Sequence, residues 1–338
     1  MSSELGRAGV SGPPQISQAA SFRSGVETFF AGAKGPLVGL VLLCVFLSLT
    51  TDTFLTVRNI LNVLDQITVL GIMAIGMTLV ILIGGIDLSV GSLIALACMV
   101  FGFVAHPDYL NLSIPVGILA ALFATGACGF VSGLLVTVAK LPPFIATLAM
   151  MSVARGMANI ITDGSQIVGF AGWFSDLSIV RHFGFLSATV ALMIVLTIIF
   201  GVFLKYRATG RSLYAIGGSA EVARLSGIPV NFLTNWVYAV CGVLSGLAGI
   251  VLAARLDSVQ PSSGVGYELD TIAAVVIGGA SLSGGIGSIG GTAIGVLIIG
   301  VLRNGLNLLG VSPFIQQIII GVVIALAVSG DTWRRRAK

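Results

Sequence analysis

Charged residues are scarce in this chain. Asp, Glu, Lys and Arg make up only 9% of its 338 residues, whereas an average soluble domain contains roughly 25%. A water-soluble chain of this size needs far more charge to cover its surface. The composition therefore excludes a soluble globular protein.

Residues that bind metals or nucleotides are also few. The two histidines, His106 and His182, lie in short polar segments, and the four cysteines stand in apolar runs without the spacing of a disulfide framework or a metal site. No Gly-Lys dipeptide occurs, so the chain lacks the P-loop that holds the phosphates of ATP. The basic residues form no stripe with interleaved aromatic residues. We therefore expect no metal, no cofactor and no nucleic acid on this chain, and no nucleophile and base combine into an enzyme active site.

Apolar residues and glycine, in contrast, are abundant. Hydrophobic residues make up 56% of the chain, the mean hydropathy is +1.08, and 45 residues are glycine. Glycine weakens helices in water but allows close helix packing in lipid. The composition predicts an all-α polytopic membrane protein.

Ten segments approach the length of about 20 apolar residues that a membrane-spanning helix needs. They are 36–51, 60–83, 88–105, 114–138, 144–161, 183–204, 230–254, 268–282, 285–303 and 313–329. The eighth and ninth segments are short and rich in glycine, so a re-entrant pair is the alternative interpretation there. We expect about ten transmembrane helices.

The positions of Lys and Arg orient these segments. Most of them fall on the cytoplasmic side if both termini are cytoplasmic. Residues 1–34 are then expected to form a disordered cytoplasmic tail, 35–330 the transmembrane domain, and 331–338 a basic cytoplasmic tail. The largest cytoplasmic connection is 205–229.

A short helix is predicted at about 220–226 in this connection. Ser219 is a good N-cap, Glu221 places a negative charge in the first turn, and Gly227 can end the helix. Such a short helix is unstable in isolation and must pack against something. It packs either on the chain's own helices or on another subunit, to which it would present Val222, Arg224 and Leu225.

The string GRSLYAIGGSAEVARLSGIPV, which contains this helix, resembles the cytoplasmic coupling segment of membrane subunits of ATP-binding-cassette sugar importers. In that family an E-x-A-(x)3-G pattern engages the ATPase, and here it falls on Glu221, Ala223 and Gly227. Three other stretches resemble the same family, namely GGIDLSVGS at 84–92 and the segments 141–164 and 267–317. The match extends from about residue 55 to 330 and is closest to the ribose-type monosaccharide permeases.

The resemblance implies a permease in the bacterial cytoplasmic (inner) membrane. The chain would form half of a pore, as a homodimer or a heterodimer with a related permease, surrounded by membrane lipid. An extracytoplasmic sugar-binding protein would deliver a monosaccharide, a ribose-like pentose or a hexose. A separate ATP-binding-cassette ATPase subunit, which holds ATP and Mg, would drive alternating access. The residues expected to couple to it are Ser219, Glu221, Val222, Ala223, Arg224, Leu225 and Gly227.

Asp87, followed closely by Ser89, interrupts an apolar run. A charge in the middle of a bilayer costs about 3 kcal/mol on insertion scales. The flanking glycines favour a turn that faces water. Asp87 therefore either caps the third span or contributes directly to the pathway or gate.

Arg155 lies inside the fifth predicted span. Ser152, Arg155 and Asn159 share one helix face because they are three and four residues apart. Such a face is expected to look inward. Arg155 either serves as a structural partner, for example of Asp87, or lines the passage and bonds sugar hydroxyls.

The main alternative function is an ion-coupled secondary sugar transporter. Such a protein would use Asp87, Arg155 or Asp270 as its relay. The shortage of carboxylates within the predicted spans argues against this alternative.

Overall fold

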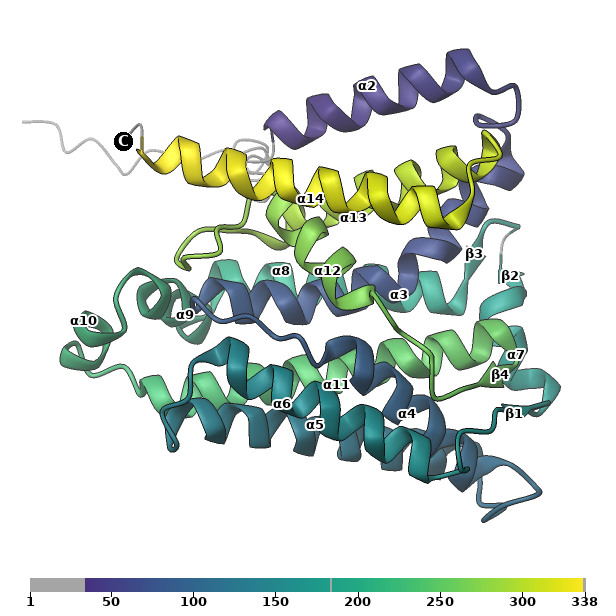
Figure 1. The fold of residues 1–338 in the computed structure, drawn as a ribbon, viewed down its shortest axis with the longest axis horizontal. Helices are drawn as coiled ribbons and strands as arrows, with labels where there is room; N and C mark the ends of the chain where they lie inside the picture. Colours follow the sequence, from purple (N-terminus) through teal and green to yellow (C-terminus); the bar gives the residue numbers. More distant parts are fainter. Residues whose placement is uncertain (1–33, 183, 337–338) are drawn as a thin grey trace, which may run out of the picture.

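The computed structural model describes residues 34–182 and 184–336, and most of them are helical (Figure 1). The helices are α2 (Lys34–Thr50), α3 (Val57–Leu82), α4 (Val90–Ala105), α5 (Ile114–Thr137), α6 (Pro143–Ile160), α7 (Gly172–Ile179), α8 (Ala188–Tyr206), α9 (Ala208–Gly218), α10 (Ala220–Leu225), α11 (Val230–Leu256), α12 (Tyr267–Ile277), α13 (Ile289–Leu308) and α14 (Pro313–Arg336). The strands are β1 (Ile167–Val168), β2 (Arg181–His182), β3 (Leu186–Ser187) and β4 (Ser258–Val259).

Each of the ten predicted apolar segments overlaps a helix. Among the described residues, five helices are long and apolar enough to cross a membrane, namely α3, α5, α8, α11 and α13. The predicted class, an all-α membrane protein, is thereby confirmed. The count of ten spans and the cytoplasmic location of both termini stay predictions.

The expected tails are only partly within the described residues. Residues 1–33 and 337–338 lie outside them. Lys34 begins α2, and α14 continues through Arg336. The segment 331–336 is therefore the last part of a helix rather than a separate tail.

The long helices lie side by side, and the two ends of the molecule differ (Figure 1). Helices α9 and α10 form the left end of the view, and α7 with the four strands lies at the right end. The start of α2 and the end of α14 are both on the α10 side. We call this side the α10 end and the opposite side the strand end.

Two interruptions divide the helical core. Residues 83–89 separate α3 from α4, and residues 278–288 separate α12 from α13. Helix α12 has 11 residues, so at 1.5 Å per residue it is about 16 Å long and cannot cross a core of about 30 Å. The predicted span 268–282 is therefore a short helix followed by non-helical chain that contains turns.

Helix α11 is the centre of the molecule and packs against α3, α4 and α5. Two glycines bring α11 and α5 close together. Gly242 of α11 lies on the backbone carbonyl of Thr125, and Gly129 of α5 lies on the backbone carbonyl of Tyr238. A methyl group at either glycine would overlap a backbone carbonyl of the other helix. Glycine is required at both positions because the backbones approach so closely.

The strand end contains elements that hydropathy does not predict. Strand β1 pairs antiparallel with β4, with Ile167 opposite Val259, and β2 pairs with β3, with Arg181 opposite Ser187. Arg181 also forms a 2.8 Å ion pair with Asp65 of α3. These contacts tie the connections around α7 to the helical core.

Candidate functional site: a coupling helix joined to two helix breaks

Helix α10 occupies Ala220–Leu225, which is one residue shorter than the predicted segment 220–226. Its N-terminus is capped as expected, because the Val222 amide donates a 3.3 Å hydrogen bond to the Ser219 hydroxyl oxygen. Gly227 has a φ of 82°, a left-handed conformation that glycine adopts without strain. The Gly227 and Ile228 amides then donate to the carbonyls of Arg224 and Ala223, which ends the helix.

Helix α10 presents apolar side chains to its surroundings. Ala223 is buried, whereas Val222 is 61% exposed and Leu225 is 84% exposed. Glu221, Arg224 and Gly227 are exposed as well. The helix packs mainly on α9 (Figure 1), and it leaves a small surface in which two apolar residues lie beside an acid and a base.

Helix α9 connects α10 to the helical core. Its buried residues Gly210, Leu213 and Ile216 recur every three positions and form one face. At the end of this face, Gly217 lies directly on the carbonyl of Leu82 and the amide of Gly285. Position 217 has no room for a side chain, because a methyl group there would overlap both backbone atoms.

Gly217 thus contacts both helix breaks at once. The breaks also contact each other, since the Gly285 amide donates a 2.9 Å hydrogen bond to the Leu82 carbonyl. The Tyr214 hydroxyl of α9 donates to the Gly287 carbonyl at 3.0 Å, and burial raises the pKa of this phenol. We call the contact of α9 with residues 82–85 and 283–287 the glycine junction.

The two breaks carry similar sequences, GGIDLSVG at 84–91 and GGASLSGG at 278–285. Both stretches share Gly-Gly, Leu-Ser and Gly in register, and the structure places their ends side by side at the glycine junction. Non-helical backbone in a membrane protein occurs where it is buried in protein or lines a water-filled cavity. This arrangement is typical of the discontinuous helices of transporters.

Asp87 lies in the first break and is fully buried. Its Oδ1 accepts hydrogen bonds from the Ser89 amide at 2.8 Å and the Ser89 hydroxyl at 2.6 Å. This turn leads directly into α4, whose N-cap residue is Ser89, and in the described part of the chain no side-chain hydrogen bond caps the first turn of α4. The capping role expected for Asp87 therefore stays a prediction. Oδ2 and the nearby Tyr238 hydroxyl make no hydrogen bond within the described residues, and the role of Asp87 in a gate stays a prediction.

Arg155 does not pair with Asp87, and this suggested pairing was wrong. Its guanidinium donates hydrogen bonds to the carbonyls of Pro261 and, at 2.8 Å, Ser263. Asp87 is instead bonded to its neighbour Ser89, and within the described part of the chain no ion pair joins the two residues. Arg155 therefore holds α6 to the chain segment that leads into α12.

Exchange of the two charges is expected to give no rescue. The double variant Asp87→Arg, Arg155→Asp removes the Ser89 turn and the two carbonyl contacts without creating a new pair. We expect it to be no more stable to heat than the worse single variant, measured on the solubilised chain. Recovery of stability in the double variant would contradict the separate partners of Asp87 and Arg155.

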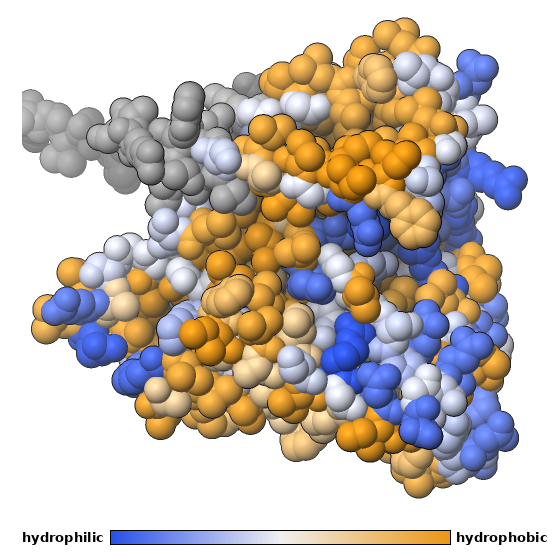
Figure 2. All heavy atoms as spheres, viewed as in Figure 1, coloured by the Kyte–Doolittle hydropathy of each residue, from blue (hydrophilic) through white to orange (hydrophobic). Residues whose placement is uncertain are grey.

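Ser152 and Asn159, which share the helix face of Arg155, are exposed on the surface of the chain. Asn159 donates to the Arg155 carbonyl at 2.8 Å. The expected inward direction therefore does not hold within one chain. Figure 2 shows that this side of the molecule is hollowed between α14 and the lower helices, with hydrophilic residues inside the hollow. We call this side the hollow face.

Several residues of the site could not be identified from the sequence alone. Gly217 stands in an ordinary Gly-Gly pair, and only the fold brings it to the breaks. Asp270 and Arg303 form an ion pair between α12 and α13, although they are 33 positions apart and share no helix spacing. Among the described residues, no group of three His, Cys, Asp or Glu could hold a metal ion.

Comparisons with known proteins agree with this arrangement. Residues 59–328 match a family model described as "Branched-chain amino acid transport system / permease component". The ribose import permease protein RbsC of Escherichia coli (strain K12) is 46% identical over 302 residues, which cover 87% of this chain and 92% of that protein. RbsC of Bacillus subtilis (strain 168) is 46% identical over 299 residues, covering 88% and 92%.

A more distant relative carries a different sugar in its name. The L-arabinose ABC transporter permease protein AraH of Azospirillum brasilense is 36% identical over 305 residues, covering 90% of this chain and 89% of that protein. No solved structure matches the chain. The family match and the membrane-spanning helices place the chain in a bacterial inner membrane. The chain therefore belongs to the family of transport-system permease components that includes these sugar permeases of ABC importers.

Proposed function

We propose that this chain is the membrane subunit of an importer that moves a monosaccharide, a ribose-like pentose or a hexose, by alternating access and at the expense of ATP hydrolysed by a separate subunit. The observation that carries the proposal is the continuous path from an exposed helix to the two helix breaks. Helix α10 presents Val222 and Leu225 outward, α9 supports it, and Gly217 contacts both breaks. The relatives' names supply the sugar class.

The energy for transport comes from the partner in this proposal. ATP-bound closure of the ATPase subunits brings the two coupling helices of the pore together, and hydrolysis resets them. Because interfaces and packed cores switch between discrete arrangements, a small movement of α10 is converted into a changed position of the breaks. The chain contributes this two-state packing and no catalytic residue.

The pore itself requires a second permease. Helices α6 and α14 border the hollow face, and they carry exposed apolar residues, among them Phe144, Met157 and Phe314. A second copy of the chain, or a related permease, facing this side would enclose the polar hollow as a passage. A sugar-binding protein outside the membrane would deliver its ligand at the strand end.

The second candidate, an ion-coupled sugar transporter, finds no support in the contacts of its expected relay residues. Arg155 is engaged by two carbonyls, Asp270 by Arg303, and Asp87 by Ser89. A relay needs groups that exchange protons or ions with the passage. These three residues are instead held in structural contacts.

Replacement of Asp87 by asparagine distinguishes the ATP-driven importer from the ion-coupled transporter. Asparagine keeps the Oδ1 acceptor for both Ser89 groups, so we expect uptake within about twofold of the wild type, whereas Asp87→Ala loses about 2 kcal/mol of stability. The measurements are ATP-driven uptake and thermal unfolding of the purified complex. Complete loss of uptake in a stable Asp87→Asn variant would favour the ion-coupled function.

The proposal is tested by purifying the tagged chain from its native membrane with a nucleotide that traps closed ATPases. We expect mass spectrometry to find an ATP-binding subunit that is lost when Glu221 is replaced by lysine. A chain that elutes alone under these conditions, and still moves sugar in vesicles without ATP, would overturn the proposal.

A further inference from the structure

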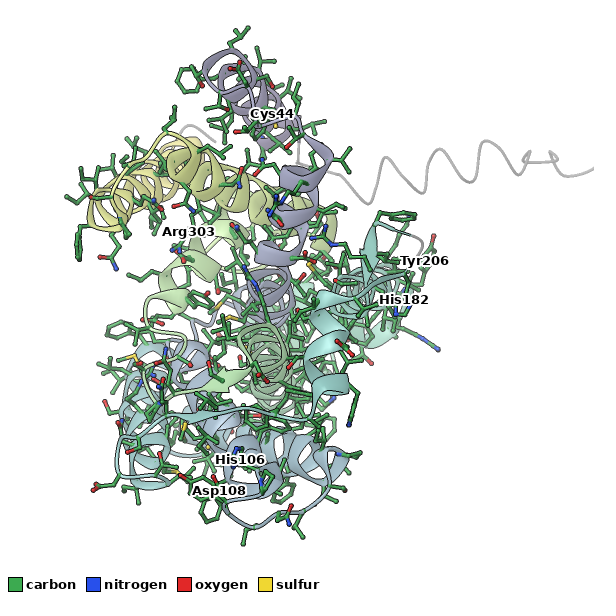
Figure 3. All side chains as sticks on the ribbon, turned by 90° about the vertical axis from the view of Figure 1, so that its right-hand side faces the viewer. Cys44, His106, Asp108, His182, Tyr206 and Arg303 are labelled. Atoms are coloured by element: carbon green, nitrogen blue, oxygen red, sulfur yellow. The ribbon has the colours of Figure 1, made fainter. Side chains whose placement is uncertain are left out.

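A cavity of about 390 Å³ opens between α12, α13 and α14, toward the strand end of the molecule. It falls in the size range of small-molecule sites, about 300–1,000 Å³. Figure 3 shows Arg303 between α12 and α14, at the place where these helices meet. The polar and aromatic residues that line the cavity include Tyr267, Asp270, Arg303, Phe314 and Gln317.

The polar centre of the cavity is the ion pair of Asp270 with Arg303. Asp270 is only 5% exposed, and the guanidinium donates to its Oδ2 through Nη2. Arg303 Nε is buried and makes no hydrogen bond within the described residues. The Arg303 side chain as a whole is 38% exposed, so part of this side chain borders the open space of the cavity.

The remaining wall supplies an amide, a phenol and an aromatic face. Gln317 is exposed, whereas Tyr267 is partly buried. Neither the Gln317 amide nor the Tyr267 hydroxyl makes a hydrogen bond among the described residues, and both residues line the cavity. Phe314 is 79% exposed. A sugar offers hydroxyls that both donate and accept, together with apolar C–H faces, and this wall complements both.

The charges in the wall select a neutral ligand. Because Asp270 and Arg303 neutralise each other, the cavity carries no net charge from this pair. A phosphate or a carboxylate would have to break the pair and leave one buried charge uncompensated. A neutral polyol can bond to its outer atoms and leave it intact.

The position of the cavity also favours access from the passage over access from lipid. Charged and amide side chains of a membrane segment face the protein interior or water rather than lipid. The cavity lies along α14, which borders the hollow face (Figure 2). A ligand in the cavity would therefore be in contact with the passage.

We propose that this cavity is a low-affinity monosaccharide subsite in the wall of the passage. The inference rests on the proposed function, which supplies the sugar. A transport subsite must bind weakly enough to release its ligand. This cavity contacts the sugar from one side only and is open toward the passage, so we expect weak binding. Gln317 and Tyr267 are its specificity-determining residues.

The test measures saturation-transfer NMR from the full chain in lipid nanodiscs to D-ribose. We expect transfer in the wild type, and a decrease of about fivefold in Gln317→Leu and in Tyr267→Phe, because each loses one hydrogen bond. Neither side chain makes a hydrogen bond to the residues that the structure describes, so both variants are expected to fold. The matched control is Gln260→Leu, which removes an exposed amide at the strand end outside the cavity and is expected to keep wild-type transfer.

Two results would overturn the subsite. One is equal transfer to D-ribose in the wild type, Gln317→Leu and Tyr267→Phe. The other is stronger transfer to L-leucine than to D-ribose, because a zwitterion would use Asp270 and Arg303 as separate charges. ATP-driven uptake by the reconstituted importer is measured in parallel, and unchanged uptake in both variants would contradict the subsite while leaving the proposed function intact. Absence of ATP-driven uptake in the wild type would instead contradict the proposed function.

Discussion

Replacement of Leu225 by aspartate is expected to abolish ATP-driven uptake and to release the ATPase while the chain itself folds normally. Leu225 is 84% exposed at the end of α10, and surface substitutions away from special features change stability by about 0.5 kcal/mol or less. In the complex, the same position is expected to enter an apolar groove of the ATPase. An unpaired charge buried there costs about 3 kcal/mol or more, which corresponds to a loss of affinity of over 100-fold.

The measurement compares the amount of ATPase that copurifies with each variant and the initial rate of sugar uptake. Leu225→Met is the matched control, since it keeps an apolar side chain of similar volume and is expected to retain both activities. Thermal unfolding of the solubilised chain verifies that the aspartate variant is folded. Normal copurification of the ATPase with Leu225→Asp would exclude α10 as the docking element.

Replacement of Gly217 by alanine has the opposite signature, because the ATPase stays bound while uptake is lost. The added methyl overlaps the Leu82 carbonyl and the Gly285 amide, so α9 must move away from the glycine junction. Overpacking of this kind typically costs about 1–3 kcal/mol. Helix α10 lies beyond α9 and keeps its exposed surface, so docking should survive while its movement no longer reaches the breaks.

The neighbouring glycine provides a matched control. A methyl group at Gly218 meets nothing within 4 Å, so Gly218→Ala makes the same chemical change one residue away without disturbing the junction. We expect at least a tenfold lower ratio of sugar transported to ATP hydrolysed for Gly217→Ala, and a wild-type ratio for Gly218→Ala. Equal ratios in the two variants would contradict transmission through the junction.

These two variants separate docking of the ATPase from transmission of its movement, because a chain of direct contacts joins α10 to the helix breaks. Helix α10 contacts α9, α9 contacts both breaks through Gly217 and Tyr214, and the first break leads to Asp87 and α4. Each contact is a backbone approach or a hydrogen bond between discrete positions. A shift at α10 can therefore move the breaks without deforming the long helices.

The fold class and the helix positions could be predicted from the sequence because they depend on hydropathy and local signals. Apolar runs placed the ten long segments, and Ser219 with Gly227 placed the short helix α10 almost to the residue. The abundance of glycine was also informative, since close helix packing in lipid requires small residues. These signals act within one segment or one turn.

The contacts of the site depend instead on how distant segments meet. Arg155 bonds backbone carbonyls of Pro261 and Ser263, and a carbonyl leaves no trace in the residue type. Asp270 and Arg303 come together only because α12 ends early and α13 returns beside it. Gly217 is one glycine among 45, and its importance follows from the two breaks that it contacts.

The most direct test of the central claim uses sealed vesicles that contain this chain together with its ATPase and sugar-binding protein, supplied with radiolabelled D-ribose. The account predicts accumulation only when ATP is present on the α10 side, unaffected by proton or sodium ionophores. It also predicts that Leu225→Asp eliminates the accumulation. Accumulation without ATP that ionophores abolish would contradict the account and establish an ion-coupled transporter.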